Sequence, residues 1–221
     1  MRGGGGKFVS EEIVQNAVDT LYANIRFSDL DGDLRSIVVT SSVPNEGKST
    51  VSILLAEAMA KSGMKTLLLE CDLRRRSLAG MLNAHPGGAG LFAVLSGQVR
   101  LSEAVVSTRQ QNLRFLDAEP NIPTPGDLLD SDRFSRLLAS LERSFDYVVI
   151  DTPPLGAFVD AAILAARADA TLLVVREGLA RRSELAAAKN QLDKAGARLL
   201  GIVMNRCQTD ISNYRYLGTT A

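Results

Sequence analysis

The chain has 221 residues, of which 46% are hydrophobic and 23% charged, and equal numbers of basic and acidic side chains give it a formal net charge of zero. This composition is ordinary for a globular domain, the neutral charge gives no reason to expect nucleic acid as a partner, and no apolar run reaches the roughly 18 residues that a membrane span needs. With 2 cysteines and 1 histidine, neither a disulfide framework nor a histidine-based triad is expected. We expect a single cytoplasmic domain over residues 1–221.

The first 35 residues are predicted to form a flexible glycine-rich leader and then an amphipathic helix. Ile13, Ala17, Leu21 and Ile25 recur at helical spacing and make one apolar stripe. We expect this stripe to pack on the chain's own sheet domain, and contact with a neighbouring subunit is the alternative. Residues 36–206 would then form the core, and residues 207–221 a short tail.

Short apolar runs alternate with helical patterns along the core. Several of the runs are continuous, as in strands that are buried on both faces of a parallel sheet. This alternation predicts an α/β fold, a mostly parallel twisted sheet with helices on both faces, in which ligands bind beyond the carboxyl ends of the strands. The expected strands lie at 37–39, 67–69, 113–116, 148–150, 172–175 and 199–204, and the expected helices at 49–61, 132–142 (with Ser131 as N-cap), 160–167 and 182–194.

The first expected strand runs into a loop that reads Ser-Ser-Val-Pro-Asn-Glu-Gly-Lys-Ser-Thr over residues 41–50. A tight loop between a strand and a helix points successive backbone N–H groups at one anion, and the helix N-terminus adds its positive dipole end. Lys48 is placed to reach the outer phosphates and the Ser49 hydroxyl to bind Mg²⁺. Ser42 stands where the first glycine of a strict P-loop would be, whereas Asn45 tolerates a positive φ. The predicted nucleotide-binding residues of this loop are Pro44, Asn45, Glu46, Gly47, Lys48, Ser49 and Thr50.

Two further strands end in acids. The run at 67–69 is followed by Glu70, Cys71 and Asp72, and the run at 148–150 by Asp151. Asp151 is predicted to hold the water shell of Mg²⁺ while Ser49 ligates the ion. For Asp72 two roles stay open: a second metal ligand, or the base that accepts a proton from an attacking hydroxyl. We expect Cys71 to point into the sheet, and the run Arg74–Arg76 to be either a phosphate or substrate contact or a solvated basic segment.

These motifs together resemble the bacterial tyrosine kinases (BY-kinases) that regulate capsular and exopolysaccharide assembly. The stretch 41–50 is similar to their Walker A sequence, 70–74 to the second motif written Asp-x-Asp-x-Arg, and 151–154 to the end of their Walker B motif. The resemblance implies a P-loop NTPase fold and autophosphorylation on tyrosine with Mg-ATP. It also implies catalytic roles for Lys48, Asp72 and Asp151, metal binding by Ser49, Asp72 and Asp151, and nucleotide contacts from Asn205, near the adenine, and from Arg206. Supporting stretches lie at 90–97, 125–129 and 201–206.

The resemblance also implies partners. Family members of this kind are activated by the cytoplasmic tail of a polysaccharide chain-length (co-polymerase) membrane protein, which would recruit the chain to the inner face of the membrane, and they form homo-oligomeric rings. The chain departs from the family at three places. Glu70 replaces the first acid of the second motif, the helix pattern Glu-x-x-Arg-x-x-Arg becomes Asn16, Asp19 and Tyr22, and the tail offers only Tyr214 and Tyr216 as acceptors.

One other class of function stays open at this point, a nucleotide-switch ATPase like those of cell division and plasmid partition. Such proteins carry a signature lysine early in the loop, and Val43 occupies that slot here. A degenerate kinase that binds ATP as a scaffold is a third interpretation, and the presence of Lys48, Ser49, Asp72 and Asp151 argues against it. Tyr147, inside an expected strand, is interpreted as a core residue.

Overall fold

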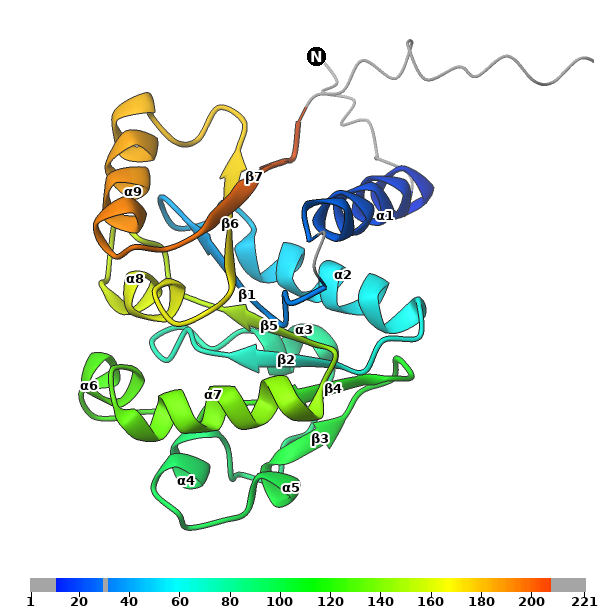
Figure 1. Ribbon diagram of the computed structural model, residues 1–221, viewed down its shortest axis with the longest axis vertical. Helices are drawn as coiled ribbons and strands as arrows, with labels where there is room; N and C mark the ends of the chain where they lie inside the picture. Colours follow the sequence, from blue (N-terminus) through cyan, green and yellow to red (C-terminus); the bar gives the residue numbers. More distant parts are fainter. Residues whose placement is uncertain (1–10, 30–31, 208–221) are drawn as a thin grey trace, which may run out of the picture.

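A seven-stranded sheet forms the centre of the computed structural model, which describes residues 11–29 and 32–207 (Figure 1). The strand order is β3-β4-β2-β5-β1-β6-β7. Neighbouring strands are parallel except for β3 and β4, which are antiparallel. The strands are β1 Ser36–Ser41, β2 Thr66–Glu70, β3 Val105–Ser107, β4 Leu113–Leu116, β5 Tyr147–Asp151, β6 Ala170–Arg176 and β7 Leu199–Asn205. The predicted α/β sheet and each of its expected strands are confirmed, and β3 is an addition.

The central strands β1, β2, β5 and β6 are buried on both faces because helices cover both. In β1, Ile37 and Val39 belong to one buried cluster and Val38 belongs to the other. This alternation follows from the two-residue period of a strand, which sends successive side chains to opposite faces. Buried hydrophobic surface of this kind contributes about 25 cal/mol per Å² to folding, so both layers stabilise the sheet that carries the site.

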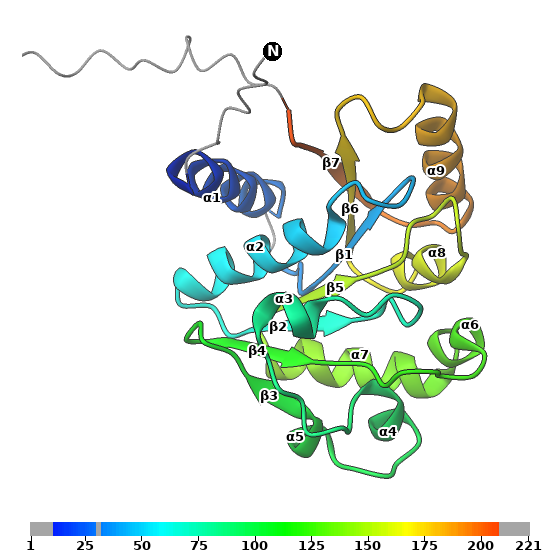
Figure 2. The ribbon, with the colours of Figure 1, turned by 180° about the vertical axis from the view of Figure 1, so that it is seen from behind.

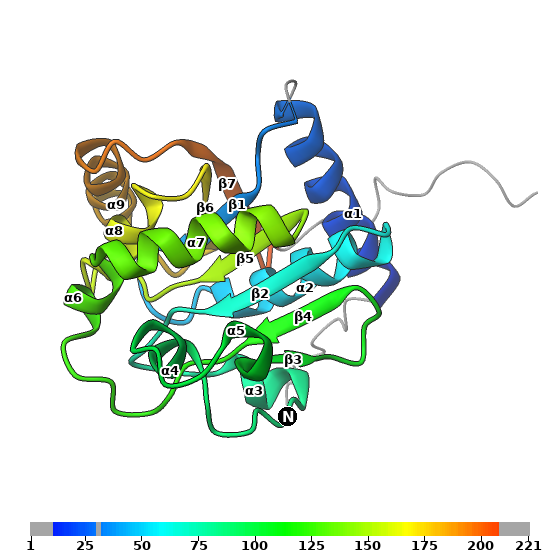
Figure 3. The same cartoon turned by 60° about the horizontal axis from the view of Figure 1, so that its bottom comes forward.

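Three helices cover one face of the sheet and the remaining ones lie mainly on the other (Figures 2 and 3). The first group is α1 Glu11–Ser28, α2 Lys48–Lys61 and α3 Leu78–Leu82. The second group is α4 Leu91–Leu95, α5 Leu101–Ala104, α6 Pro125–Leu129, α7 Asp132–Ser144, α8 Asp160–Ala165 and α9 Arg182–Lys194. The four predicted core helices are confirmed with small shifts of their ends. The Ser131 hydroxyl caps α7 by accepting a hydrogen bond from the Phe134 N–H at 3.2 Å.

The amphipathic helix α1 packs on α2, as predicted. Its predicted apolar stripe is covered only in its second half, because Ile25 is buried and Leu21 half-buried whereas Ile13 and Ala17 are exposed. Val18, Tyr22 and Ile25 are buried in this contact, whereas Val14 near the N-terminal end stays 36% exposed. The Tyr22 ring meets the Tyr147 ring edge-on, with centroids 6.0 Å apart. Among the helices within the described ranges, none combines the length and the apolar character required to cross a bilayer.

Candidate active site

The loop between β1 and α2 has the conformation that a phosphate cradle needs. Asn45 has φ 68° and Gly47 has φ 92°, so both lie in the left-handed region, as predicted for Asn45. Gly47 is also sterically required, because a Cβ atom there would lie 2.1 Å from Nδ2 of Asn205. That amide donates a hydrogen bond to the Glu46 carbonyl oxygen at 2.8 Å, which joins the loop to the end of β7.

The Glu46 side chain points into the protein and away from the cradle, and its exposed fraction is 0%. Its Oε2 accepts hydrogen bonds from the Ser42 hydroxyl at 2.8 Å and from the Val43 N–H at 2.9 Å. Ser42, which replaces the first P-loop glycine, therefore contributes a hydroxyl that braces the loop from within. The prediction of Glu46 as a phosphate-binding residue now depends on its backbone N–H alone.

Lys48 and Ser49 each contact one of the predicted acids. The Lys48 Nζ lies 2.9 Å from Oδ2 of Asp72, and their side chains are 13% and 4% exposed. The Ser49 hydroxyl donates to Oδ2 of Asp151 at 2.7 Å. The sheet register explains this arrangement, because Glu70 at the end of β2 pairs with Asp151 at the end of β5. Both acids therefore lie in front of the N-terminus of α2.

Ser52 was not predicted as a site residue. Its hydroxyl donates to the second Asp151 oxygen, Oδ1, at 2.9 Å. Since residues three apart lie on the same face of a helix, its position relative to Ser49 could have indicated this contact. Both oxygens of the Asp151 carboxylate are thus held by hydroxyl groups of α2.

Burial and mutual proximity shift the pKa values of three charged groups here. Burial tends to lower the pKa of Lys48, but the nearby Asp151 and Asp72 carboxylates outweigh it and raise that pKa. Burial raises the pKa of Asp151 against the opposing effect of Lys48. Burial, followed by the charge of Asp151, raises the pKa of Glu70 to about 8. Lys48 therefore stays positively charged and opposes the accumulation of negative charge around the strand ends.

Glu70 holds the segment between β2 and α3. Its Oε2 accepts from the Ser77 and Leu78 N–H groups, each at 3.0 Å, and its Oε1 accepts from the Asp72 N–H at 3.3 Å. The extra methylene at this position therefore lets the carboxylate reach the first residues of α3. Both Glu70 oxygens are occupied by backbone donors, and the Asp72 backbone is held beside Lys48.

A pocket of about 360 Å³ opens in front of the loop and is strongly cationic. Its charged lining residues are Lys48, Arg75, Arg176 and Arg206, and no acid lines it. Such a lining fits a polyanion of the size of a triphosphate. Arg176 was not predicted, although its position after the apolar run at 172–175 puts it at the same sheet edge as the acids. The other lining residues are Asn45, Gly47, Ser49, Thr50, Ser77 and Met81.

Comparison with known proteins identifies the family. Residues 34–182 match the family model described as an AAA domain. The tyrosine-protein kinase CpsD of Streptococcus pneumoniae serotype 4 is 36% identical over 204 residues, which cover 92% of this chain and 90% of CpsD. The chain belongs to the bacterial tyrosine-protein kinase family.

Solved structures agree with this assignment. The kinase domain of the Escherichia coli tyrosine kinase ETK matches this bacterial tyrosine kinase homologue with a TM-score of 0.81 at 29% identity, over 88% of this chain and 78% of that chain. The septum site-determining protein MinD complexed with Mg-ADP, from Pyrococcus horikoshii, matches with a TM-score of 0.68 at 25% identity, over 79% of this chain and 71% of that one. The P-loop kinase fold is therefore shown, and the family implies binding of a nucleotide with a divalent metal ion.

The side chains around Ser49 fit a magnesium ion. The Ser49 hydroxyl and the Asp151 carboxylate can supply oxygen ligands, and Asp72 contacts the neighbouring Lys48. Within residues 11–29 and 32–207, no group of three or more histidine, cysteine, aspartate or glutamate side chains could hold a metal ion by itself. Mg²⁺ characteristically takes one or two carboxylates and completes its shell with water and phosphate oxygens, so this sparse oxygen set suits it.

The arginine run of the kinase divides between two kinds of contact. Arg74 pairs with Asp160 at 3.0 Å and lies 4.0 Å over the Phe158 ring, and Arg76 pairs with Asp117. Only Arg75 lines the cationic pocket. The interpretation of this run as a solvated basic segment is therefore wrong for Arg74 and Arg76, because each pairs with a buried acid. Cys71 is fully buried, as predicted.

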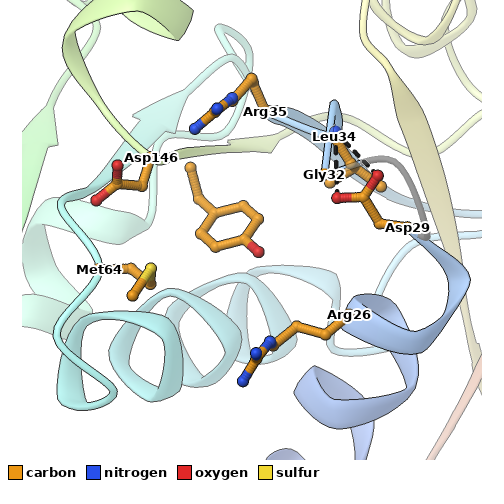
Figure 4. Close-up of a pocket in the computed structure, with 8 residues that line it drawn as sticks. Arg26, Asp29, Gly32, Leu34, Arg35, Met64 and Asp146 are labelled. Atoms are coloured by element: carbon orange, nitrogen blue, oxygen red, sulfur yellow. Dashed lines mark hydrogen bonds between the residues drawn. The ribbon is translucent and has the colours of Figure 1, made fainter.

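A second pocket, of about 260 Å³, lies at the opposite ends of the strands (Figure 4). Arg26 and Arg35 lie on opposite sides of this pocket. The Asp29 carboxylate accepts a hydrogen bond from the Leu34 N–H at 3.2 Å. Tyr147 also lines this pocket, so the predicted core residue is only half-buried, and burial raises its pKa to about 12. None of the predicted site residues lines this pocket, so we assign the chemistry to the cationic pocket.

Proposed function

We propose that this protein transfers the γ-phosphoryl group of ATP to tyrosine hydroxyl groups, including those of its own tail, and acts in capsular or exopolysaccharide assembly. The observation that carries the proposal is the contact with Asp72 of Lys48, a residue that lines the cationic pocket, together with the hydrogen bond of Ser49 to Asp151. We propose that the P-loop binds the phosphates, that Ser49 and Asp151 hold the metal ion, and that Asp72, beyond the end of β2, acts as the base. Family membership supports tyrosine as the acceptor, and the role in polysaccharide assembly is carried over from the family.

In the proposed mechanism the backbone N–H groups of residues 44–50 and the Lys48 ammonium bind the phosphates. Lys48 must then leave Asp72, and this frees the Asp72 carboxylate to accept the proton of the attacking tyrosine. As the tyrosine oxygen bonds to the γ-phosphorus, the bond from that phosphorus to the ADP oxygen breaks. Mg²⁺ bound at Ser49 and Asp151 would neutralise charge on the phosphate oxygens. Asn205 is proposed to contact the nucleotide near its base, and Arg206, which lines the cationic pocket, is proposed as a further nucleotide contact.

A nucleotide-switch ATPase is the second candidate, because MinD shares the fold. Two observations favour the kinase. Val43 occupies the slot where those ATPases carry their signature lysine, and Asp72 adds to the P-loop a carboxylate that contacts Lys48. A switch that only hydrolyses ATP needs a positioned water and no tyrosine acceptor. The product of the reaction therefore distinguishes the two functions.

The remaining proposals concern organisation and partners. We propose one domain over residues 1–221, a cytoplasmic location, and activation by the cytoplasmic tail of a polysaccharide co-polymerase membrane protein that recruits the kinase to the membrane. A homo-oligomer is also proposed. Tyr22 occupies the slot of the last arginine in the family's ring motif and is buried against α2, and Asp19 accepts a hydrogen bond from Gln15 at 2.8 Å. An oligomer of this chain would therefore use other contacts.

The test is incubation of the full chain with Mg-ATP, with and without a candidate activator tail, followed by mass-spectrometric mapping of phosphotyrosine. Tyr214 and Tyr216, which lie outside the described residues, are the expected acceptors. Lys48→Met serves as the inactive control and should lose nucleotide binding or turnover. ADP release without any modified tyrosine would overturn the kinase in favour of the switch ATPase. Full labelling of a chain that lacks residues 213–221 would eliminate the tail as acceptor.

A further inference from the structure

Glu46 is an acid buried directly beneath the phosphate cradle. A carboxylate there repels a bound triphosphate, and burying it carries a desolvation cost, so its presence needs a compensating role. No lysine or arginine among the described residues forms an ion pair with it. Its partners are hydrogen-bond donors alone. This arrangement indicates that Glu46 serves to organise structure.

Both oxygens of the Glu46 carboxylate accept hydrogen bonds. Oε2 receives the Ser42 hydroxyl and the Val43 N–H, and Oε1 receives the Arg176 N–H at 3.2 Å. Among side chains of this length, only a glutamate carboxylate can accept hydrogen bonds at both of its terminal atoms. A glutamine would present its NH₂ group, a donor, to one of the two sets of donors. The side chain therefore ties the start of the P-loop to the last residue of β6.

Arg176 is the residue that this tie holds. Its side chain lines the cationic pocket together with Lys48 and Arg206. In the part of the chain that the structure describes, no carboxylate pairs with its guanidinium. In β6 and β7, Arg176 pairs in register with Asn205, whose amide donates to the Glu46 carbonyl oxygen. The carboxylate and the carbonyl of Glu46 therefore bind the ends of two strands.

We infer that Arg176 contacts the phosphates of the bound nucleotide and that Glu46 is the positioning residue that holds Arg176 there. This inference rests on the proposed function, since it assumes that the cationic pocket takes ATP. An arginine fork matches phosphate oxygens in a bidentate geometry, but only if its backbone is fixed relative to the loop that holds the phosphates. The Glu46–Arg176 hydrogen bond supplies that fixed relation.

The test is a double-mutant cycle on nucleotide affinity, with a fluorescent ATP analogue titrated into the full chain with Mg²⁺ present. Arg176→Gln should weaken binding about 10- to 100-fold, the range expected for a lost hydrogen bond to a charged group. Glu46→Gln should weaken binding about tenfold, because the amide meets a donor in either orientation. The double variant should bind no more weakly than Arg176→Gln alone, since Glu46 acts through Arg176.

Glu119→Gln is the matched control, because the Glu119 carboxylate likewise accepts three hydrogen bonds, here from the N–H groups of Gly90, Phe92 and Ala93, and does not line the pocket. It should leave affinity unchanged. Additive losses of affinity in Arg176→Gln and Glu46→Gln would overturn the inference. Unchanged affinity in Arg176→Gln would also overturn it, and this measurement can be made even if Glu46→Gln does not fold. Failure of the unmodified chain to bind the analogue would instead overturn the proposed function.

Discussion

We expect the replacement of Asp72 by asparagine to separate nucleotide binding from phosphoryl transfer. The substitution keeps the side-chain size, and its remaining carbonyl oxygen can still accept the Arg75 N–H, which lies 3.0 Å from Oδ1 of Asp72. It removes the charge that now holds Lys48 at 2.9 Å. A hydrogen bond between charged groups is worth about 1.5–3 kcal/mol, and part of it must be given up when Lys48 turns to the phosphates.

We therefore expect Asp72→Asn to bind the ATP analogue as tightly as the unmodified chain or up to about tenfold more tightly. Phosphotyrosine formation in a single turnover should nevertheless fall by about 10²- to 10⁴-fold, the usual contribution of a positioned base. Affinity is measured by equilibrium titration and transfer by quenched-flow sampling with mass spectrometry. Asp117→Asn is the control, because Asp117 is also buried and paired with an arginine but lies outside the pocket.

Two results would refute this reasoning. If affinity and transfer fall together by the same factor, Asp72 acts by shaping the loop, and its role as base is wrong. If transfer is unchanged while binding tightens, the carboxylate competes for Lys48 but takes no part in the chemistry. Thermal unfolding of both variants checks that each is folded, because breaking a buried pair is itself destabilising.

Three further predictions concern the same site. Gly47→Ala should weaken nucleotide binding by about tenfold or more, since φ is 92° and the methyl group would lie 2.1 Å from a neighbouring amide nitrogen. Gly80→Ala is the control and should leave nucleotide binding unchanged, because the added atom meets nothing within 4 Å. Because burial raises the pKa of Glu70 from 4.5 to about 8, the free energy of unfolding should fall as the pH rises between these values, on the order of 3 kcal/mol. Glu70→Gln should reduce this dependence on pH. If the free energy of unfolding, measured by thermal melts at pH 5 and pH 8, changes equally in the variant and the unmodified chain, the prediction is wrong. Ser52→Ala removes the donor 2.9 Å from Oδ1 of Asp151, so the Mg²⁺ concentration for half-maximal transfer should rise about tenfold or more, and an unchanged Mg²⁺ titration would count against this role.

The fold was predictable because its strands are continuous apolar runs that end in polar residues. The run at 67–69 and the run at 148–150 each become a buried strand, and the acids that follow them lie side by side in the sheet. The short helices α3 to α6 were not predicted, since four or five residues span too little of the helical period to leave a pattern. The same holds for the three-residue strand β3, whose pairing with β4 depends on tertiary contact.

The sequence allowed us to predict which residues gather at the candidate site, but not which way their side chains point. Lys48, Asp72 and Asp151 follow from the order of strand, loop and helix. The inward turn of Glu46 does not, because two of its donors come from Ser42 and from Arg176, which is 130 residues further along the chain. Likewise Arg74 and Arg75 are neighbours in sequence, but the first pairs with Asp160 and the second lines the pocket. Long-range partners decide such orientations, and local pattern carries no information about them.

The position of the end of β7 bears on the proposal that Tyr214 is a phosphoryl acceptor. Arg206, the residue after this strand, lines the pocket, and Tyr214 follows eight residues later in the sequence. Eight residues reach at most about 28 Å, so if Tyr214 is the acceptor, its hydroxyl would be present at an effective concentration on the order of millimolar near the pocket of its own chain. Labelling within one chain would proceed at a rate independent of enzyme concentration, whereas labelling between chains would slow in proportion to dilution. A dilution series of the full chain therefore tells which chain presents the tyrosine.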